Sequence, residues 1–241
     1  KMWRKRIVNI LGVLLLVLCM GIALDKEVCG DTPLKVGVLD IYQEQNKASG
    51  YNWYRNNSVR PLLSFLKELG VDAELVSWKK AREKISGPSV AYDMLFLPND
   101  VESIPLADYN SFKEYVNNGK IIVFLGSAAK FYYEEDEKEI KKASRAKKDL
   151  AEFIGVKQFG GGLADEVTFM QSTPLTCGFP INTSLKGKDV SIEVCRQGWY
   201  LTQSKVLATC QGGYENDFKA GNKSLNYFLV LTKYGRGHTI Y

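Results

Sequence analysis

The chain has 241 residues and a formal net charge of +5, from 32 Lys and Arg against 27 Asp and Glu. Four of the basic residues lie within the first six positions, so the rest carries 28 basic and 27 acidic side chains. A near-neutral domain has no general electrostatic affinity for DNA or RNA, which argues against a nucleic-acid partner. With one histidine and no Cys-x-x-Cys pair, the sequence shows no zinc pattern, and we expect neither a metal nor another cofactor.

The first 23 residues are typical of an export signal. Four basic residues, Lys1, Arg4, Lys5 and Arg6, precede a run over residues 7–23 that is apolar except for Asn9. This arrangement directs a chain out of the cytoplasm, and we expect cleavage after Ala23. Retention of residues 7–23 as a membrane anchor is the alternative, and a lipoprotein is a third. All three predict an extracytoplasmic protein that is secreted, periplasmic or at the cell surface.

Residues 24–33 are expected to be a short linker, and residues 34–241 a single domain whose first half alternates strand-like and helix-like segments. Apolar runs predict strands over residues 35–40, 73–78, 92–98 and 120–125, and helical spacing predicts helices over residues 59–69, 79–85 and 106–116. Strands separated by helices imply a mostly parallel sheet with helices on both faces. The predicted fold class is therefore α/β, with a three-layer flavodoxin-like arrangement.

The second half of the domain has a different pattern. A charged helical segment is expected over residues 131–154, and strand-like runs follow at residues 166–170, 190–195, 205–210, 227–231 and 238–241. These runs lack long helices between them, so we expect a mixed or antiparallel C-terminal extension of the sheet. The glycine-rich residues 160–162 and 212–213 have no following lysine and helix, and are expected to be loops. The chain stops inside an apolar run, which leaves open that it is a fragment.

Four cysteines remain beyond the signal segment. They are Cys29, Cys177, Cys195 and Cys210. An even count in an oxidising compartment suggests one or two disulfides, and a bridge among the three C-terminal cysteines is favoured over one that reaches Cys29. The alternative is that all four are reduced and act as small apolar side chains.

Several sequence pieces in order resemble the class I glutamine-amidotransferase-like superfamily, including its trehalose-utilisation-like and related exported groups. The pieces are the first strand, YDMLFLP over residues 92–98, NGKIIVFLG over 118–126, TPLTCGFP over 173–180 and KYGRGHTIY over 233–241. Their order and spacing carry the resemblance, since none is specific alone. The alternative is a generic flavodoxin-like domain.

The resemblance implies a nucleophilic cysteine on the turn after the fourth strand, where helix and backbone N–H groups stabilise a thiolate. Ser127 stands at that position in this chain. The family's histidine and acid, spaced His-x-Glu, have no counterpart, because the single histidine, His238, is followed by Thr239 and Ile240. Glutamine hydrolysis is therefore not expected.

Candidate ligand-binding residues follow the strands, because ligands of open α/β sheets bind outside the carboxyl ends of the strands. This rule selects Asp40, Asn99, Asp100, Glu102 and Ser127. The loop after the first strand adds Trp53, Tyr54 and Arg55, residue types that suit a sugar ring. Helix capping is the alternative role for Asp100 and Ser127, and packing of the loop onto its own domain is the alternative for the aromatic residues.

Three functions follow from these observations. The first is a non-catalytic, extracytoplasmic amidotransferase-like domain that binds a carbohydrate or supports an enzyme or assembly of the cell envelope. The second is a hydrolase with Ser127 as nucleophile, His238 as base, and Asp40 or Glu166 as the acid. The third is a purely structural domain of a larger envelope protein.

Overall fold

The computed structural model describes most of the domain in separate stretches. These are residues 34–40, 59–68, 70–85, 91–98, 103–125, 131–133, 143–144, 152–156, 160–170, 181–182, 184–196, 204–213, 221 and 224–241. The predicted signal segment and linker lie outside them. No helix among the described residues combines the length and the apolar character needed to cross a bilayer.

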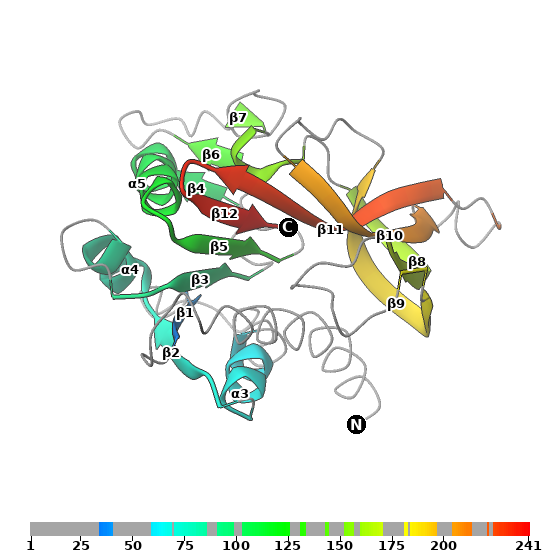
Figure 1. Cartoon of the computed structure of the whole chain (residues 1–241), viewed down its shortest axis with the longest axis horizontal. Coiled ribbons are helices and arrows are strands. Elements are labelled where there is room, and N and C mark those ends of the chain that lie inside the picture. The colour runs from blue at the N-terminus through cyan, green and yellow to red at the C-terminus, as the bar shows by residue number, and fades with distance from the viewer. Residues whose placement is uncertain are drawn as a thin grey trace.

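The first half contains parallel strands and the helices that connect them (Figure 1). The strands are β1 (Lys35–Leu39), β2 (Asp72–Val76), β3 (Met94–Leu97) and β5 (Ile121–Phe124), and the helices are α3 (Arg60–Glu68), α4 (Trp78–Ile85) and α5 (Leu106–Asn117). β1, β3 and β5 are short and mainly apolar, whereas β2 alternates exposed acids with buried Ala73 and Val76. Gly70 and Gly119 follow α3 and α5 with positive φ angles of 76° and 93°, which is the usual way for a helix to end.

Long antiparallel strands make up the second half. They are β8 (Gly160–Phe169), β9 (Ser184–Arg196), β10 (Ser204–Gly213), β11 (Ser224–Tyr234) and the short β12 (Gly237–Ile240). A separate small sheet is formed by β4 (Ser103–Pro105), β6 (Phe131–Tyr133) and β7 (Ala143–Ser144).

One mixed sheet of nine strands joins the two halves, in the order β10-β8-β9-β11-β12-β5-β3-β1-β2. Five neighbouring strands, β2, β1, β3, β5 and β12, run parallel to one another. Strand β12 then pairs antiparallel with β11. The prediction of a mostly parallel α/β sheet with an antiparallel C-terminal extension is therefore confirmed at the level of a mixed α/β sheet.

The antiparallel strands also close on themselves. Besides pairing with β8, β10 pairs with β11, and β11 in turn pairs with β9 through Asn226 and Tyr227. The strands β8, β9, β10 and β11 thus form a ring, which extends to the right of the parallel strands in Figure 1. Ring closure pairs the edges of these strands, so β2 is left as an outer strand of the main sheet.

Both faces of the parallel strands are buried. Along β3, Leu95 and Leu97 belong to one hydrophobic cluster, while Met94 and Phe96 belong to another. Helices α4 and α5 contribute to the cluster that contains Leu95, and α3 contributes to the cluster that contains Phe96. Alternate side chains of a strand point to opposite faces, which explains why these strands are apolar throughout.

The structure corrects three details of the sequence analysis. Residues 131–133 form β6 rather than helix, because they pair with β4 and β7, and only residues 152–154 of the expected 131–154 helix are described as helical. The glycines 160–162 and 212–213 lie inside β8 and β10 rather than in loops, since backbone pairing requires no side chain. Trp78 begins α4 instead of ending the second strand.

Cys210 forms no disulfide, and the bridge expected among the C-terminal cysteines stays a prediction for the other two. Cys210 is a buried, reduced cysteine in β10 that packs in the cluster around Phe96. Cys195 lies in β9 without a described side chain, and Cys29 and Cys177 lie outside the described residues.

Candidate functional site

Asp40 lies at the carboxyl end of β1 and is fully buried. Its backbone N–H donates to the carbonyl oxygen of Val76 at 2.8 Å, which extends the pairing of β1 with β2 to the last residue of β2. At the same edge, the N–H of Leu125 donates to the carbonyl oxygen of Leu97 at 2.9 Å. The strands β1, β2, β3 and β5 thus end at the same edge of the sheet, and Asp40 places a carboxyl group at the end of β1.

The carboxyl end of β1 lies at the point of the sheet where the strand order reverses. The chain passes from β1 outward to β2 on one side, and then returns to β3 on the other side before moving on to β5. Strand order therefore reverses between β1 and β3, and the helices that follow these two strands, α3 and α5, pack in different hydrophobic clusters. Ligands of open α/β sheets bind at such a point, so Asp40 is where a ligand-binding carboxylate is expected.

The other residues predicted for this edge lie outside the described part of the chain. They are Trp53, Tyr54, Arg55, Asn99, Asp100, Glu102 and Ser127. That these residues lie close to Asp40 stays a prediction. Their neighbours in sequence are described: Pro98 is buried at the end of β3, and Leu125 is half-buried at the end of β5.

His238 lies at the opposite edge of the sheet. It pairs with Ile121, the first residue of β5, and β12 runs parallel to β5. Ser127 follows the other end of β5, and the four residue steps from Ile121 to Leu125 span about 13 Å at the usual strand rise. The pairing of Ser127 with His238 stays a prediction, and the strand register counts against it.

The two carboxylates that were predicted as the acid of a triad with His238, Asp40 and Glu166, are distant from it. Val36 occupies the same row of the sheet as His238, three strands away, and Asp40 is four residues further along β1. Strand spacing and rise place Asp40 and His238 on the order of 20 Å apart. Glu166 on β8 pairs with Gln211 on β10. Gln211 is six residues along β10 from Lys205, which lies near His238, so Glu166 is also on the order of 20 Å from that end of β10. Neither carboxylate can orient this imidazole.

The surroundings of His238 are basic. Burial lowers the pKa of His238, and the positive charges of Lys233 and Lys205 lower it further. A neutral imidazole is therefore favoured, but among the described residues no carboxylate is placed to hold its tautomer as the third member of a catalytic triad would.

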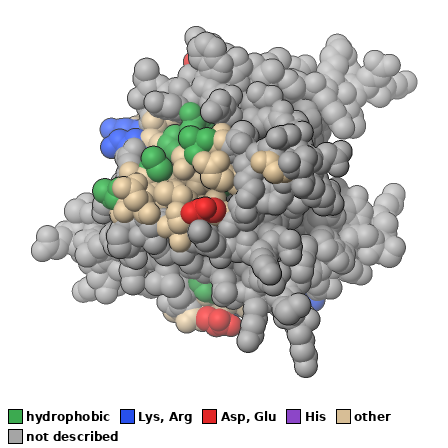
Figure 2. All heavy atoms as spheres, turned by 90° about the vertical axis from the view of Figure 1, so that its right-hand side faces the viewer, with side chains coloured by type: hydrophobic (Ala, Val, Ile, Leu, Met, Phe, Trp, Pro, Cys, Tyr) green, Lys and Arg blue, Asp and Glu red, His purple; other side chains and the backbone are tan. Residues whose placement is uncertain are grey.

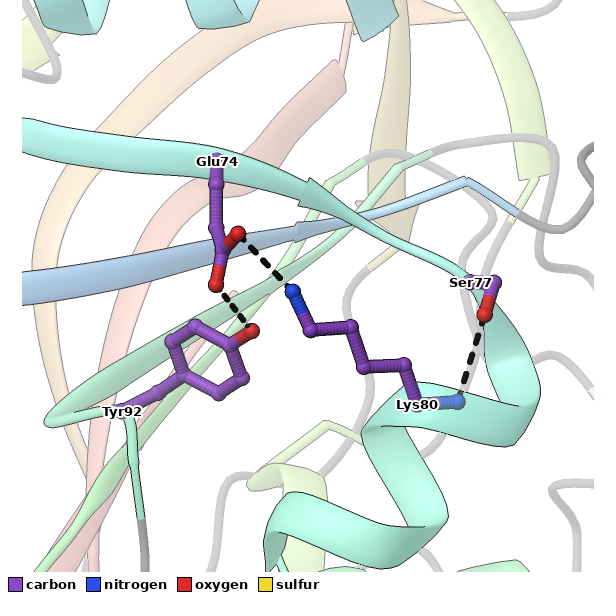
Figure 3. A network of polar contacts seen from close by, with 4 residues as sticks. All are labelled: Glu74, Ser77, Lys80 and Tyr92. Atoms are coloured by element: carbon purple, nitrogen blue, oxygen red, sulfur yellow. Dashed lines mark hydrogen bonds and ion pairs between the residues drawn. The ribbon is translucent and has the colours of Figure 1, made fainter.

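A polar network at the amino half of the sheet was missed by sequence analysis (Figure 3). The hydroxyl of Tyr92, just before β3, donates to a carboxylate oxygen of Glu74 on β2, and Lys80 Nζ on α4 donates to the other oxygen at 2.9 Å. The backbone N–H of Lys80 donates to Ser77 Oγ at 3.2 Å, so Ser77 caps α4. Burial, followed by the hydrogen bond and charge of Glu74, raises the pKa of Tyr92.

Two further ion pairs connect elements. Asp93 accepts from the backbone N–H of Lys35 at 3.1 Å and from Lys120 Nζ at 2.7 Å, which joins the starts of three strands. Arg82 on α4 forms a two-pronged pair with Asp108 on α5, at 2.6 and 2.7 Å. These contacts brace the scaffold rather than form a reacting centre. Among the described residues, no group of three His, Cys, Asp or Glu side chains is placed to hold a metal ion.

The surface of the ring strands exposes some apolar side chains. Figure 2 shows the face that corresponds to the right-hand side of Figure 1, with hydrophobic side chains gathered near one edge beside Lys or Arg side chains. The large hydrophobic residues most exposed in the described chain are Met170, Ile181 and Leu225, which lie near strand ends. Single exposed apolar residues are normal on a soluble surface and do not by themselves indicate a site.

Comparison with known proteins shows a likeness at the level of fold. No protein-family model matches the chain, and no curated protein is similar to it in sequence. Among solved structures, the chain is similar to Gan42B, a GH42 β-galactosidase from G. stearothermophilus, with a TM-score of 0.53 and 14% identity over 87% of the chain. A β-galactosidase from Bacillus circulans sp. alkalophilus gives a TM-score of 0.52 and 13% identity over 86% of the chain.

The matched region is a part of those enzymes. This chain covers 27% of the Gan42B chain and 28% of the Bacillus circulans enzyme. At this level of identity the likeness concerns the fold alone.

Proposed function

We propose that this protein is an extracytoplasmic, non-catalytic amidotransferase-like domain that binds a carbohydrate and supports a larger carbohydrate-active enzyme or envelope assembly. The observation that carries the proposal is the fully buried Asp40 at the carboxyl end of β1, beside the point where strand order reverses. A carboxylate there accepts hydrogen bonds from ligand hydroxyl groups, which is what sugar recognition requires.

The strand order supports the family assignment that this proposal includes. The parallel strands follow one another as β2-β1-β3-β5-β12, which corresponds to the flavodoxin-like order. We infer a three-layer arrangement from the two hydrophobic clusters, because α3 packs in one and α4 and α5 pack in the other. This is the scaffold that the amidotransferase-like resemblance implies.

Two observations favour binding over catalysis. Ser127 replaces the family's nucleophilic cysteine, and His238 lies at the amino edge of the sheet, about 20 Å from Asp40 by strand geometry. A hydrolytic site would need these groups within hydrogen-bond distance.

The carbohydrate and the accessory role have separate support. The loop that follows Asp40 contains Trp53, Tyr54 and Arg55, residue types that stack on sugar rings and bind their hydroxyls. The similar structures are β-galactosidases of which the chain covers about a quarter, so this fold occurs inside longer carbohydrate-active chains. The N-terminal apolar segment supports an extracytoplasmic location.

A binding titration tests the proposal. Neutral oligosaccharides, including galactosides, would be titrated into the full chain by calorimetry, and again with Asp40→Asn and Trp53→Ala. We expect at least one ligand to bind and its affinity to fall about tenfold or more in both variants, since a lost hydrogen bond to a buried charge costs roughly 1.5–3 kcal/mol. Lys80→Gln, a charge change on α4, is the matched control and should bind normally. Binding that survives Asp40→Asn unchanged would remove the site from this edge.

A further inference from the structure

Three basic side chains converge on one face of the sheet at the edge opposite Asp40. Lys233 on β11 pairs directly with His238 on β12, and Lys205 on β10 pairs directly with Leu231 on β11. Residues paired across strands lie on the same face, as do residues two apart along one strand. Lys205, Lys233 and His238 therefore share a face, with Lys205 diagonal to Lys233.

The two lysines are solvent-exposed and His238 is half-buried between its neighbours. Their charges act on one another, because both lysines disfavour the protonated form of the imidazole. Like charges this close repel, so holding them together has an energetic cost unless an anion offsets it.

Within the described part of the chain, no carboxylate forms an ion pair with Lys205 or Lys233. Other basic residues of the same sheet and its helices do have such partners: Lys80 pairs with Glu74, and Lys120 pairs with Asp93. The basic cluster thus concentrates positive charge without the carboxylate partner that Lys80 and Lys120 have.

The backbone that carries the cluster is held firmly. Lys233 and His238 flank a tight hairpin closed by the pairing of Tyr234 with Gly237. A side chain at Gly237 would meet the carbonyl oxygens of Val116 and Lys120 at 2.2 Å, so this strand lies directly against the end of α5. The N–H of His238 also donates to the carbonyl oxygen of Lys120 at 3.2 Å. The backbone that carries Lys233 and His238 is therefore fixed before any ligand binds.

We propose that Lys205, Lys233 and His238 form a second binding site, which takes a tetrahedral oxyanion, the sulfate or phosphate group of a free ion or of an anionic polysaccharide. Two ammonium groups neutralise the charge of such an anion, and the imidazole donates a hydrogen bond to one of its oxygens. The site lies on the order of 20 Å from Asp40, so it is independent of the ligand proposed there.

The single histidine makes the proposal directly testable. The full chain, without a histidine tag and with ¹⁵N-labelled histidine, gives imidazole signals from His238 alone. Sulfate is the main probe, because its charge does not change while the imidazole titrates. We expect a saturable shift of the His238 signals with sulfate and a rise in the His238 pKa, since a bound anion stabilises the imidazolium.

Variants and controls complete the test. Lys205→Gln and Lys233→Gln should each weaken sulfate binding at least about fivefold, because each removes a unit charge next to the anion. Lys80→Gln changes the net charge equally but lies on α4, and should bind sulfate as the unchanged protein does. Sodium chloride at equal ionic strength accounts for general screening.

Two results would overturn the proposal. One is a His238 response to sulfate no larger than the response to chloride, and the other is a saturable response that both lysine variants retain. Dextran sulfate and neutral dextran then identify the source of the anion. Tighter binding of dextran sulfate than of inorganic sulfate, lost in Lys233→Gln, supports a polysaccharide ligand, whereas equal binding supports a free ion.

Discussion

Tyr92 reaches across β1 to donate its hydroxyl hydrogen bond to Glu74 on the outer strand β2 (Figure 3). Its ring passes over Gly37, where an added Cβ would lie 3.3 Å from Tyr92 Cγ and 3.0 Å from Val76 Cγ2. The added Cβ would also lie 3.1 Å from Leu95 Cδ1, so a side chain at this position of β1 would require several neighbours to shift. The glycine is therefore explained by the close packing of Val76, Leu95 and Tyr92 around it.

Replacing Tyr92 by Phe should lower the free energy of unfolding by about 1 kcal/mol, the usual net contribution of one hydrogen bond. The loss is modest because Glu74 is half-exposed and keeps its contact with Lys80. Urea denaturation measures it. Glu74→Gln, which retains an acceptor for the hydroxyl, should cost less than Tyr92→Phe; the reverse order would show that the charge of Glu74, not the Tyr92 bond, carries the stability.

Sequence patterns predicted the elements whose signals are local. The strands β1, β3 and β5 are apolar on both faces, and α3 and α5 end at glycines with positive φ, so hydrophobic patterns and end signals located them. Residues 131–133 and 160–162 were misassigned because their strand state depends on partners far along the chain, such as β4 for β6 and β9 for β8. Intrinsic preference is weak against such pairing.

In the candidate site, too, the residues with a local sequence signal were predicted and those that depend on strand pairing were not. Asp40 was identified because an acid directly after a buried strand is visible in the sequence, and the strand order then gave it significance. The separation of His238 from Asp40 and Glu166 could not be predicted, since it depends on the register of β12 against β5. The basic cluster of Lys205, Lys233 and His238 was missed for the same reason.

Gly155 is expected to tolerate no side chain. It has a φ of 88°, and an added Cβ would lie 1.7 Å from Thr232 Oγ1 and 2.7 Å from Ser204 Oγ. Thr232 also donates to the carbonyl oxygen of Ile154 at 3.3 Å, so the residues around Gly155 are tied to β11. Gly155→Ala should cost about 3 kcal/mol or more, from the left-handed backbone and the overpacking together.

The matched control for this prediction is Gly70→Ala. Gly70 has a similar φ of 76°, but nothing lies within 4 Å of its added Cβ. Its replacement should cost only about 1 kcal/mol, the backbone contribution alone. Equal losses in the two variants, measured by denaturant unfolding, would mean that the contact of Gly155 with Thr232 is not tight.

The ion pair of Arg82 with Asp108 should contribute more to stability than that of Lys80 with Glu74. The side chain of Asp108 is 5% exposed and accepts two hydrogen bonds from one guanidinium group, while both partners of the Lys80 pair are close to half-exposed. We expect Arg82→Gln to cost about 1–2 kcal/mol, after allowing for solvent screening of the exposed Arg82, and Lys80→Gln to change stability by less than about 0.5 kcal/mol.

Thermal and urea unfolding at low and high salt distinguish the two pairs. Arg82→Lys, which keeps the charge but loses the two-pronged geometry, should fall between the unchanged protein and Arg82→Gln. If Arg82→Lys is as stable as the unchanged protein, charge alone accounts for the pair.

His238 should make stability depend on pH. Burial and the two lysines lower its pKa in the folded protein, while the unfolded chain has an ordinary value of about 6.5. Between these two values the unfolded state binds more protons, so the free energy of unfolding rises with pH in that window. The contribution is present above about pH 6.5 and is lost as the pH falls through the folded pKa. Urea midpoints measured across this window should therefore rise as the pH is raised in the unchanged protein, and should rise less in His238→Gln. Lys233→Gln should reduce the slope partly, since burial remains as the main cause. Parallel curves for the unchanged protein and His238→Gln would mean that the imidazole titrates in the folded chain as it does in the unfolded one.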